Sequence, residues 1–138
     1  MMRTDISCLC GAVQVQLEGA PSVQFYCHCD DCQATSGGAY VGVALYPASA
    51  VTVLRGELVS YALKTMPRKR CAVCGTSMLA VVPGRDQIGI KSDRLPAGLF
   101  APAFHENCRY ALHPIKDPLP HYKGYPALFG GSDELVGW

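Results

Sequence analysis

Three cysteines stand within six residues, in the stretch Cys27-His28-Cys29-Asp30-Asp31-Cys32. Thiols this close are poor disulfide partners, because the bond fixes its own dihedral angle and the separation of its two Cα atoms. Thiolates from one tight turn can instead share a divalent ion, and soft sulfur favours zinc over calcium or magnesium. The stretch therefore predicts a metal site with three protein ligands, which leaves one position for water or substrate, as in catalytic zinc sites.

Two further cysteine pairs lie far apart in the chain: Cys8 with Cys10, and Cys71 with Cys74. Each pair can hold an ion from one side, and two such pairs make a closed tetrahedral site. Gly11 and Gly75 directly follow the second cysteine of each pair. Glycine lets the backbone turn sharply there and direct its amides at the sulfurs. We expect these four cysteines to form a structural zinc site.

Other interpretations of these cysteines stay open at this point. Cys71 and Cys74 have the spacing of a redox dithiol, although no β-α-β pattern surrounds them. Ligand number alone also allows an iron–sulfur cluster. The three groups of cysteines could exchange members, so the pairing is less certain than the metal. Ligand softness and a reducing compartment favour zinc.

A zinc ion held by three thiolates is predicted to bind and activate a further thiol at its vacant fourth position. A thiol bound at the vacant position would ionise near neutral pH, because zinc stabilises the thiolate. The resulting nucleophile can attack a small carbonyl carbon and give a hemithioacetal. In reverse, the same site would cleave a carbon–sulfur bond.

The elements that position these cysteines are mostly strands. Alternating or β-rich patterns predict strands over residues 12–17, 22–26, 39–45, 51–54, 58–63, 77–82 and 87–91. Arg55-Gly56-Glu57 is typical of a hairpin turn between two of them. Residues 33–36 can form one helical turn that Gly37-Gly38 ends, with Asp30 or Asp31 at its N-terminus. Repeated prolines after Leu95 predict an irregular C-terminal stretch. We expect residues 1–138 to form a single, mainly β domain.

Composition narrows the class of partner. The chain has 138 residues and a net charge of +1, which argues against a broad phosphate-binding surface and makes nucleic acid an unlikely ligand. The short run Arg68-Lys69-Arg70 either attracts ligand carboxylates or a nucleic-acid phosphate, or is a solvated face. No signal peptide or membrane-spanning stretch is evident, so we expect a cytoplasmic protein, where eight cysteines point to metal rather than to disulfides.

The order of the motifs resembles a known family. C-x-C-G, then C-H-C-x-x-C followed by Ser36-Gly37, then C-x-x-C-G-T look like the glutathione-dependent formaldehyde-activating enzymes, a family that includes centromere protein V and its relatives. The likeness runs from Cys8 to Pro126. It implies a β-tent fold of twisted antiparallel sheets and two zinc ions per chain. One would be structural, and the other would lie at the substrate site. The structural ligands would be Cys8, Cys10, Cys71 and Cys74, and the substrate-site ligands Cys27, Cys29 and Cys32.

The implied activity is the condensation of glutathione with formaldehyde to S-(hydroxymethyl)glutathione, a carbon–sulfur lyase reaction. The partners would be a small thiol such as glutathione and a small aldehyde, and a homodimer stays open. An alternative hypothesis is a non-catalytic, zinc-stabilised module that binds protein or nucleic acid. A fourth protein ligand at the three-cysteine metal would favour that alternative.

Several residues allow two interpretations. His28 is the candidate catalytic residue, which would protonate the developing alkoxide, and it can equally pack beside the site. Cys108 is either a fourth ligand or a free buried thiol. Family members often carry His-Ile-Trp where this chain has His105-Glu106-Asn107, and its one tryptophan is Trp138. The wall of the substrate pocket is therefore expected to differ, with His105 as a lining candidate by analogy.

Overall fold

The computed structural model describes residues 2–138 and divides into two compact units. Of the described residues, unit 1 comprises 2–23 and Ala44–Phe100, and unit 2 comprises Gln24–Val43 and Ala101–Trp138. The single domain predicted from the sequence stays a prediction, because the compactness of two units does not show whether either folds alone.

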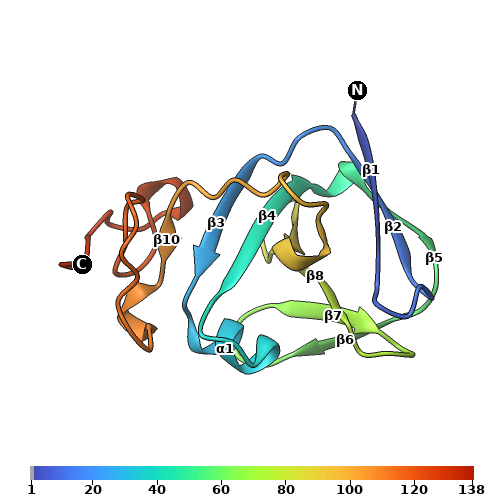
Figure 1. The fold of residues 1–138 in the computed structure, drawn as a ribbon, viewed down its shortest axis with the longest axis horizontal. Coiled ribbons are helices and arrows are strands. Elements are labelled where there is room, and N and C mark those ends of the chain that lie inside the picture. Colours follow the sequence, from blue (N-terminus) through green and yellow to red (C-terminus); the bar gives the residue numbers. More distant parts are fainter. Residues whose placement is uncertain (1) are drawn as a thin grey trace. The chain divides into compact units, whose positions relative to one another are not determined.

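The fold is mainly β, as predicted, with one short α-helix among the described residues (Figure 1). The strands are β1 Arg3–Ser7, β2 Gln14–Glu18, β3 Val23–Cys27, β4 Val41–Pro47, β5 Val51–Arg55, β6 Leu58–Ala62, β7 Pro67–Cys71, β8 Ser77–Val81, β9 Gln87–Lys91 and β10 His105–Glu106. The helix α1 is Asp30–Ser36, and the 3₁₀ turns are Ala48–Ala50, Ser92–Arg94, Cys108–Tyr110 and Ala127–Phe129.

Unit 1 contains a three-stranded antiparallel sheet in the order β1-β2-β5. Thr4 and Ile6 of β1 and Val15 and Leu17 of β2 are buried, while their neighbours along each strand are more exposed. This period of two turns one face of the sheet toward a hydrophobic core. The core consists of Ile6, Cys8, Val13, Val15, Leu17, Ala44, Tyr46, Cys71, Met78, Leu79 and Ile90.

Unit 1 also contains four strands in the order β9-β8-β7-β6, and each neighbouring pair among them is antiparallel. Strand β7 was not predicted, because its sequence PRKRC is basic rather than apolar. It nevertheless buries Arg68 and Cys71, which lie on either side of the register shift between Lys69 and Arg70. Strand β1 was also missed, since Ile6 is its one large apolar residue.

The predicted hairpin at Arg55-Gly56-Glu57 is wrong. Strand β5 pairs with β2, whereas β6 pairs with β7, so the turn carries the chain from one sheet to the other. Gly56 has φ +90° and passes close to Ala12 and Val13. A Cβ at this position would collide with the Ala12 carbonyl oxygen and lie 2.7 Å from the Val13 Cα. Only glycine fits this crossing without a backbone shift.

Unit 2 contains β10, residues 24–27 of β3 and residues 41–43 of β4, in the strand order β10-β3-β4, and β10 and β3 run parallel. The segment after Pro120 lies beside β10, since His105 N–H donates to the Pro120 oxygen and Tyr122 N–H donates to the His105 oxygen, both at 2.9 Å. Phe25 stacks on Phe104 with ring centroids 5.3 Å apart, and Phe129 meets Phe25 edge-on at 5.4 Å. These rings form an aromatic core for the unit.

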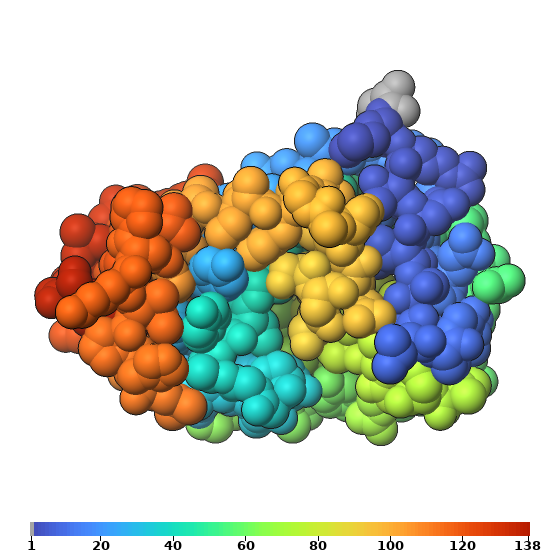
Figure 2. Space-filling view, in the orientation of Figure 1, coloured from blue at the N-terminus to red at the C-terminus, as the bar shows by residue number. Residues whose placement is uncertain are grey.

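The C-terminal stretch is irregular, as its prolines predicted. Beyond Leu95 the described elements are the two-residue strand β10 and two 3₁₀ turns. In the space-filling view this orange-to-red segment forms one continuous patch of surface (Figure 2). No helix in residues 2–138 has both the length and the apolar character needed to cross a membrane.

We predict that Gly56→Ala destabilises the protein by more than about 2 kcal/mol, because it adds a collision to an unfavourable positive φ. Gly84→Ala is the matched control, since Gly84 has φ +70° but open space around it, and about 1 kcal/mol is expected there. Urea unfolding of metal-loaded protein measures both. Equal losses for the two variants would contradict the close approach at Gly56.

Candidate functional site

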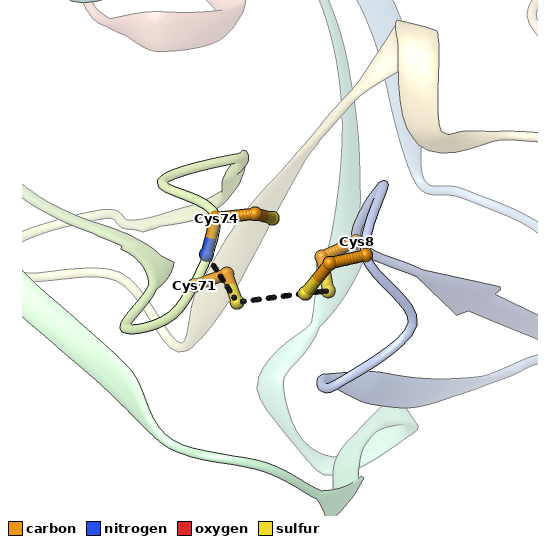
Figure 3. Close-up of side chains that lie close together, drawn as sticks. Cys8, Cys71 and Cys74 are labelled. Carbon is orange, nitrogen blue, oxygen red and sulfur yellow. Dashed lines mark hydrogen bonds between the residues drawn. The ribbon is translucent and has the colours of Figure 1, made fainter.

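Four cysteines of unit 1 converge as their spacing predicted. Cys8 and Cys10 lie in the turn between β1 and β2, and Cys71 and Cys74 lie at the turn between β7 and β8. Their four sulfurs all lie within 4.8 Å of one another. Figure 3 shows Cys8, Cys71 and Cys74 directed toward one another from these two turns. Sequence reasoning left the pairing of the clusters open, and the structure brings these four together.

The spacing of these sulfurs fits a tetrahedral metal site. Zinc–sulfur bonds of about 2.3 Å at tetrahedral angles separate the sulfurs by about 3.8 Å. The Cys8 and Cys10 sulfurs are 3.6 Å apart, and those of Cys10 and Cys71 are 3.8 Å apart. None of the eight cysteines, all within the described residues 2–138, forms a disulfide. The donor set therefore suits a soft divalent ion held by four thiolates.

The backbone around this cluster supports thiolates in the same way at both turns. Val13 N–H donates to the Cys8 sulfur at 3.2 Å, and Val73 N–H donates to the Cys71 sulfur at 3.3 Å. Gly11 and Gly75 have φ +81° and +78°, so both turns use the left-handed conformation that the sequence predicted. Amides directed at sulfur offset part of the negative charge of the thiolates.

Thr76 joins the two turns. Its hydroxyl accepts from Leu9 N–H at 3.1 Å and lies 2.9 Å from the Cys74 sulfur. The hydrogen bond from Thr76 lowers the pKa of the Cys74 thiol to about 5. Thr76 therefore favours the ionised form of Cys74, which is the form that binds metal.

The second cluster lies in unit 2 and is local in sequence. Cys27 ends β3, Cys29 is the N-cap of α1, and Cys32 lies in the first turn of that helix. Their three sulfurs also lie within 4.8 Å of one another. Cys32 N–H donates to the Cys29 sulfur at 3.3 Å, so a ligand sulfur takes the place of the usual capping oxygen. Gly37, with φ 70°, ends the helix as predicted.

The electrostatics of this trio favour a bound cation. The neighbouring thiols of Cys29 and Cys32, with burial, raise the pKa of Cys27 well above its ordinary value. Three adjacent thiolates repel one another in a buried place, and a dication reverses that balance. The three sulfurs are thus a suitable set for a soft metal with one position left over.

Cys108 lies outside this group of sulfurs. It is buried, and burial raises the pKa of its thiol to about 12. Its position outside the trio favours the interpretation of Cys108 as a buried thiol that is not a ligand.

His28 lies between two of the cysteines and is buried. Its Nε2 is 2.9 Å from Nδ1 of His105, and its ring stacks on Tyr40 with centroids 4.6 Å apart. Burial, together with the nearby His105, lowers the pKa of His28 to about 4. His28 is therefore neutral near pH 7, and the structure places it in a histidine network whose hydrogen bonds orient the ring.

This network continues through an acidic residue that the sequence did not single out. His105 Nε2 is 2.7 Å from one oxygen of Asp117, and His121 Nε2 is 2.9 Å from the other. A carboxylate only accepts, so both histidines donate through Nε2. When the rings are neutral, His105 Nδ1 must then accept from His28 Nε2.

The trio of His105, Asp117 and His121 has metal-binding residue types within 4.8 Å of one another, but its spacing is that of hydrogen bonds. Zinc bonds to nitrogen and oxygen of about 2.0–2.1 Å would separate tetrahedral donors by about 3.3 Å. The observed 2.7 and 2.9 Å are shorter and suit N–H···O contacts. We interpret this trio as a hydrogen-bond network that positions His28.

The basic run Arg68-Lys69-Arg70 does not form a continuous basic face. Arg68 is 6% exposed, and the guanidinium of Arg70 lies 4.9 Å from the centre of the Tyr61 ring. Along β7 Arg68 is buried and Arg70 exposed, with a register shift between Lys69 and Arg70. This arrangement gives no support to a phosphate-binding surface at the run.

Sequence reasoning missed two residues beside the three-cysteine cluster, Glu106 and Asn107. Both are buried, and Asn107 Nδ2 donates to the Cys27 sulfur at 3.6 Å. They occupy the positions where the chain departs from the His-Ile-Trp that family members often carry. That departure was the signal that could have found them.

Comparisons with known proteins agree with the fold and the cysteine clusters. The sequence profile of the glutathione-dependent formaldehyde-activating enzymes matches residues 3–110. A solved structure of a Rhodobacter sphaeroides protein has 22% sequence identity and a TM-score of 0.57, with the match covering 68% of this chain and 89% of that chain. This second likeness shows the fold alone. A comparison with curated proteins finds no match.

The profile match spans most of the chain and includes all seven cysteines of the two clusters. At the level of the family it carries a function related to formaldehyde and glutathione. The chain therefore belongs to the glutathione-dependent formaldehyde-activating enzyme family.

Proposed function

We propose that the protein is a zinc-dependent carbon–sulfur lyase that condenses glutathione, or a similar thiol, with formaldehyde or another small carbonyl. The observation that carries this proposal is the trio of Cys27, Cys29 and Cys32, whose sulfurs form a group without a fourth cysteine. A metal held by three thiolates keeps a position for a substrate ligand, whereas the four-cysteine cluster is closed.

The reaction balances without an oxidant or reductant. The sulfur of the thiol forms a bond to the carbonyl carbon, and the electron pair of the C=O π bond moves to oxygen. The proton that the thiol loses ends on that oxygen and gives a hemithioacetal. A bound zinc ion would supply the stabilisation of the substrate thiolate. The residues that would hold it are the three cysteines of the trio.

We also propose that His28 handles the proton of this reaction. Because His28 is neutral near pH 7 and its Nε2 is paired with His105, its Nδ1 is the atom suited to accept a proton. Asp117, through His105, would orient the ring as an acidic residue does for a catalytic histidine. A cytosolic location, where glutathione keeps thiols reduced, belongs to the same proposal.

Metal analysis tests the two sites. Freshly reduced protein is expected to hold two zinc ions per chain, and Cys29→Ser to hold one while staying folded. Cys108→Ser is the matched control and keeps both. Cys71→Ser is expected not to fold, because a closed zinc site contributes about 10–16 kcal/mol, comparable to the whole stability of a domain. Protein without zinc, or Cys29→Ser that loses both ions, would contradict this assignment.

Exchange spectroscopy tests the activity. NMR of glutathione with formaldehyde measures how fast the free thiol and its hydroxymethyl adduct interconvert. We expect the protein to raise this rate at least about tenfold over buffer, a small part of what orientation of reactants can supply. Cys29→Ser should return the rate to that of buffer. Equal rates for wild type and buffer, with zinc bound, would remove the proposed activity.

A further inference from the structure

Glu106 is a buried acidic residue in register with a ligand of the three-cysteine cluster. It is 4% exposed and pairs with Cys27 in the parallel ladder of β10 and β3. His28 N–H donates to the Glu106 carbonyl oxygen at 3.1 Å, which fixes the two strands together at this point. Residues opposite each other on neighbouring strands direct their side chains to the same face of the sheet. The carboxyl of Glu106 is therefore on the same side as the Cys27 sulfur.

The two carboxyl oxygens of Glu106 have different surroundings. Oε2 accepts from Asn107 Nδ2 at 3.3 Å. The same amide nitrogen is 3.6 Å from the Cys27 sulfur, so one side chain contacts both acceptors. Oε1 is buried and has no hydrogen-bond partner. A buried polar atom without a partner costs free energy, and the oxygen of an ionised carboxylate costs most.

A buried carboxyl with an unpartnered oxygen is satisfied in place either by a proton or by a nearby cation. The trio of sulfurs beside it is a set of donors for a cation that lacks one ligand. Zinc also takes a carboxylate oxygen as a ligand in mixed sets with sulfur or imidazole nitrogen.

We propose that the Glu106 carboxylate is the fourth protein donor to the metal ion of Cys27, Cys29 and Cys32, and that a substrate thiolate competes with it for this position. Only the second part of this inference, the competition with a substrate thiolate, rests on the proposed function. Glu106 lies beside Cys27 and outside the close group of three sulfurs, which makes its oxygen the replaceable member of the set. A thiolate is the softer ligand and is favoured over carboxylate at a sulfur-rich site.

Other residues near the trio are less suited to this position. The Nε2 of His28 is paired with His105, and the thiol of Cys108 is far from ionising and outside the sulfur group. Asn107 offers an amide that donates to Cys27 and Glu106, so it positions both rather than binding metal itself. Glu106 is thus the acidic side chain with an unpartnered buried oxygen at the cluster.

Glu106→Gln tests the proposal, with Glu18→Gln as the control because Glu18 is exposed on β2. Competition with a chelator measures how tightly the weaker zinc ion is held without added thiol. We expect Glu106→Gln to weaken that site at least about tenfold, since even residues that only support a ligand change metal affinity this much. Glu18→Gln should match wild type. An unchanged affinity in Glu106→Gln would overturn the proposal.

Binding of glutathione to the zinc-loaded proteins gives the second measurement. If the carboxylate and the thiolate compete, Glu106→Gln should bind glutathione several-fold more tightly than wild type, opposite in sign to its loss of zinc affinity. Cobalt substitution reports the exchange directly, because a fourth thiolate adds sulfur-to-cobalt absorption. Weaker binding of both zinc and glutathione would assign Glu106 a structural role and overturn the proposal.

The two proposals fail in different ways. Reduced zinc affinity in Glu106→Gln, with no glutathione binding in either protein, upholds Glu106 as a donor and removes the proposed lyase function. If Glu106→Gln does not fold, Glu106→Asp keeps a carboxylate on a shorter side chain. Its zinc affinity is then expected to lie below that of wild type, and a value equal to wild type would overturn the proposal.

Discussion

Crowding of like charge is the constraint on which both sites depend. Thiolates bind metal, yet adjacent thiolates repel one another, and the neighbours of Cys27 raise the pKa of its thiol well above the ordinary value. The sulfurs therefore ionise fully only when a cation is bound. Metal binding consequently releases protons and becomes less favourable in acid. Amides and the Thr76 hydroxyl provide the smaller share of this stabilisation at the four-cysteine cluster.

The two clusters differ in how far apart in the sequence their cysteines lie. The four-cysteine cluster joins segments 61 residues apart, so a metal ion bound there would close a long loop and order the sheets of unit 1. The trio comes from one strand end and one helix turn, so a metal ion there would close only a short loop. Loss of the first ion would thus be a folding event, whereas the second could exchange ligands at little structural cost.

Sequence reasoning predicted what local patterns encode. The cysteine spacings gave both clusters, alternation gave most strands, and Gly37 marked the end of α1. It missed β7, because the burial of Arg68 depends on tertiary contacts that a basic run does not reveal. It predicted a hairpin at Gly56 because a turn signal does not say which strands pair. Glu106, Asn107, Asp117 and His121 were missed for the same reason, since they meet the site only through long-range register.

The capping sulfur of Cys29 has a consequence for how the three-cysteine motif can change in evolution. Cys29 begins the helix and Cys32 lies three residues later, on the same side of its first turn. One residue inserted between them would rotate the third sulfur by about 100° around the helix axis, away from the other two. The spacing C-x-x-C is therefore fixed by the angle between successive residues around the helix axis. By contrast, the long stretch between Cys10 and Cys71 can gain or lose residues in its loops without changing how those two meet.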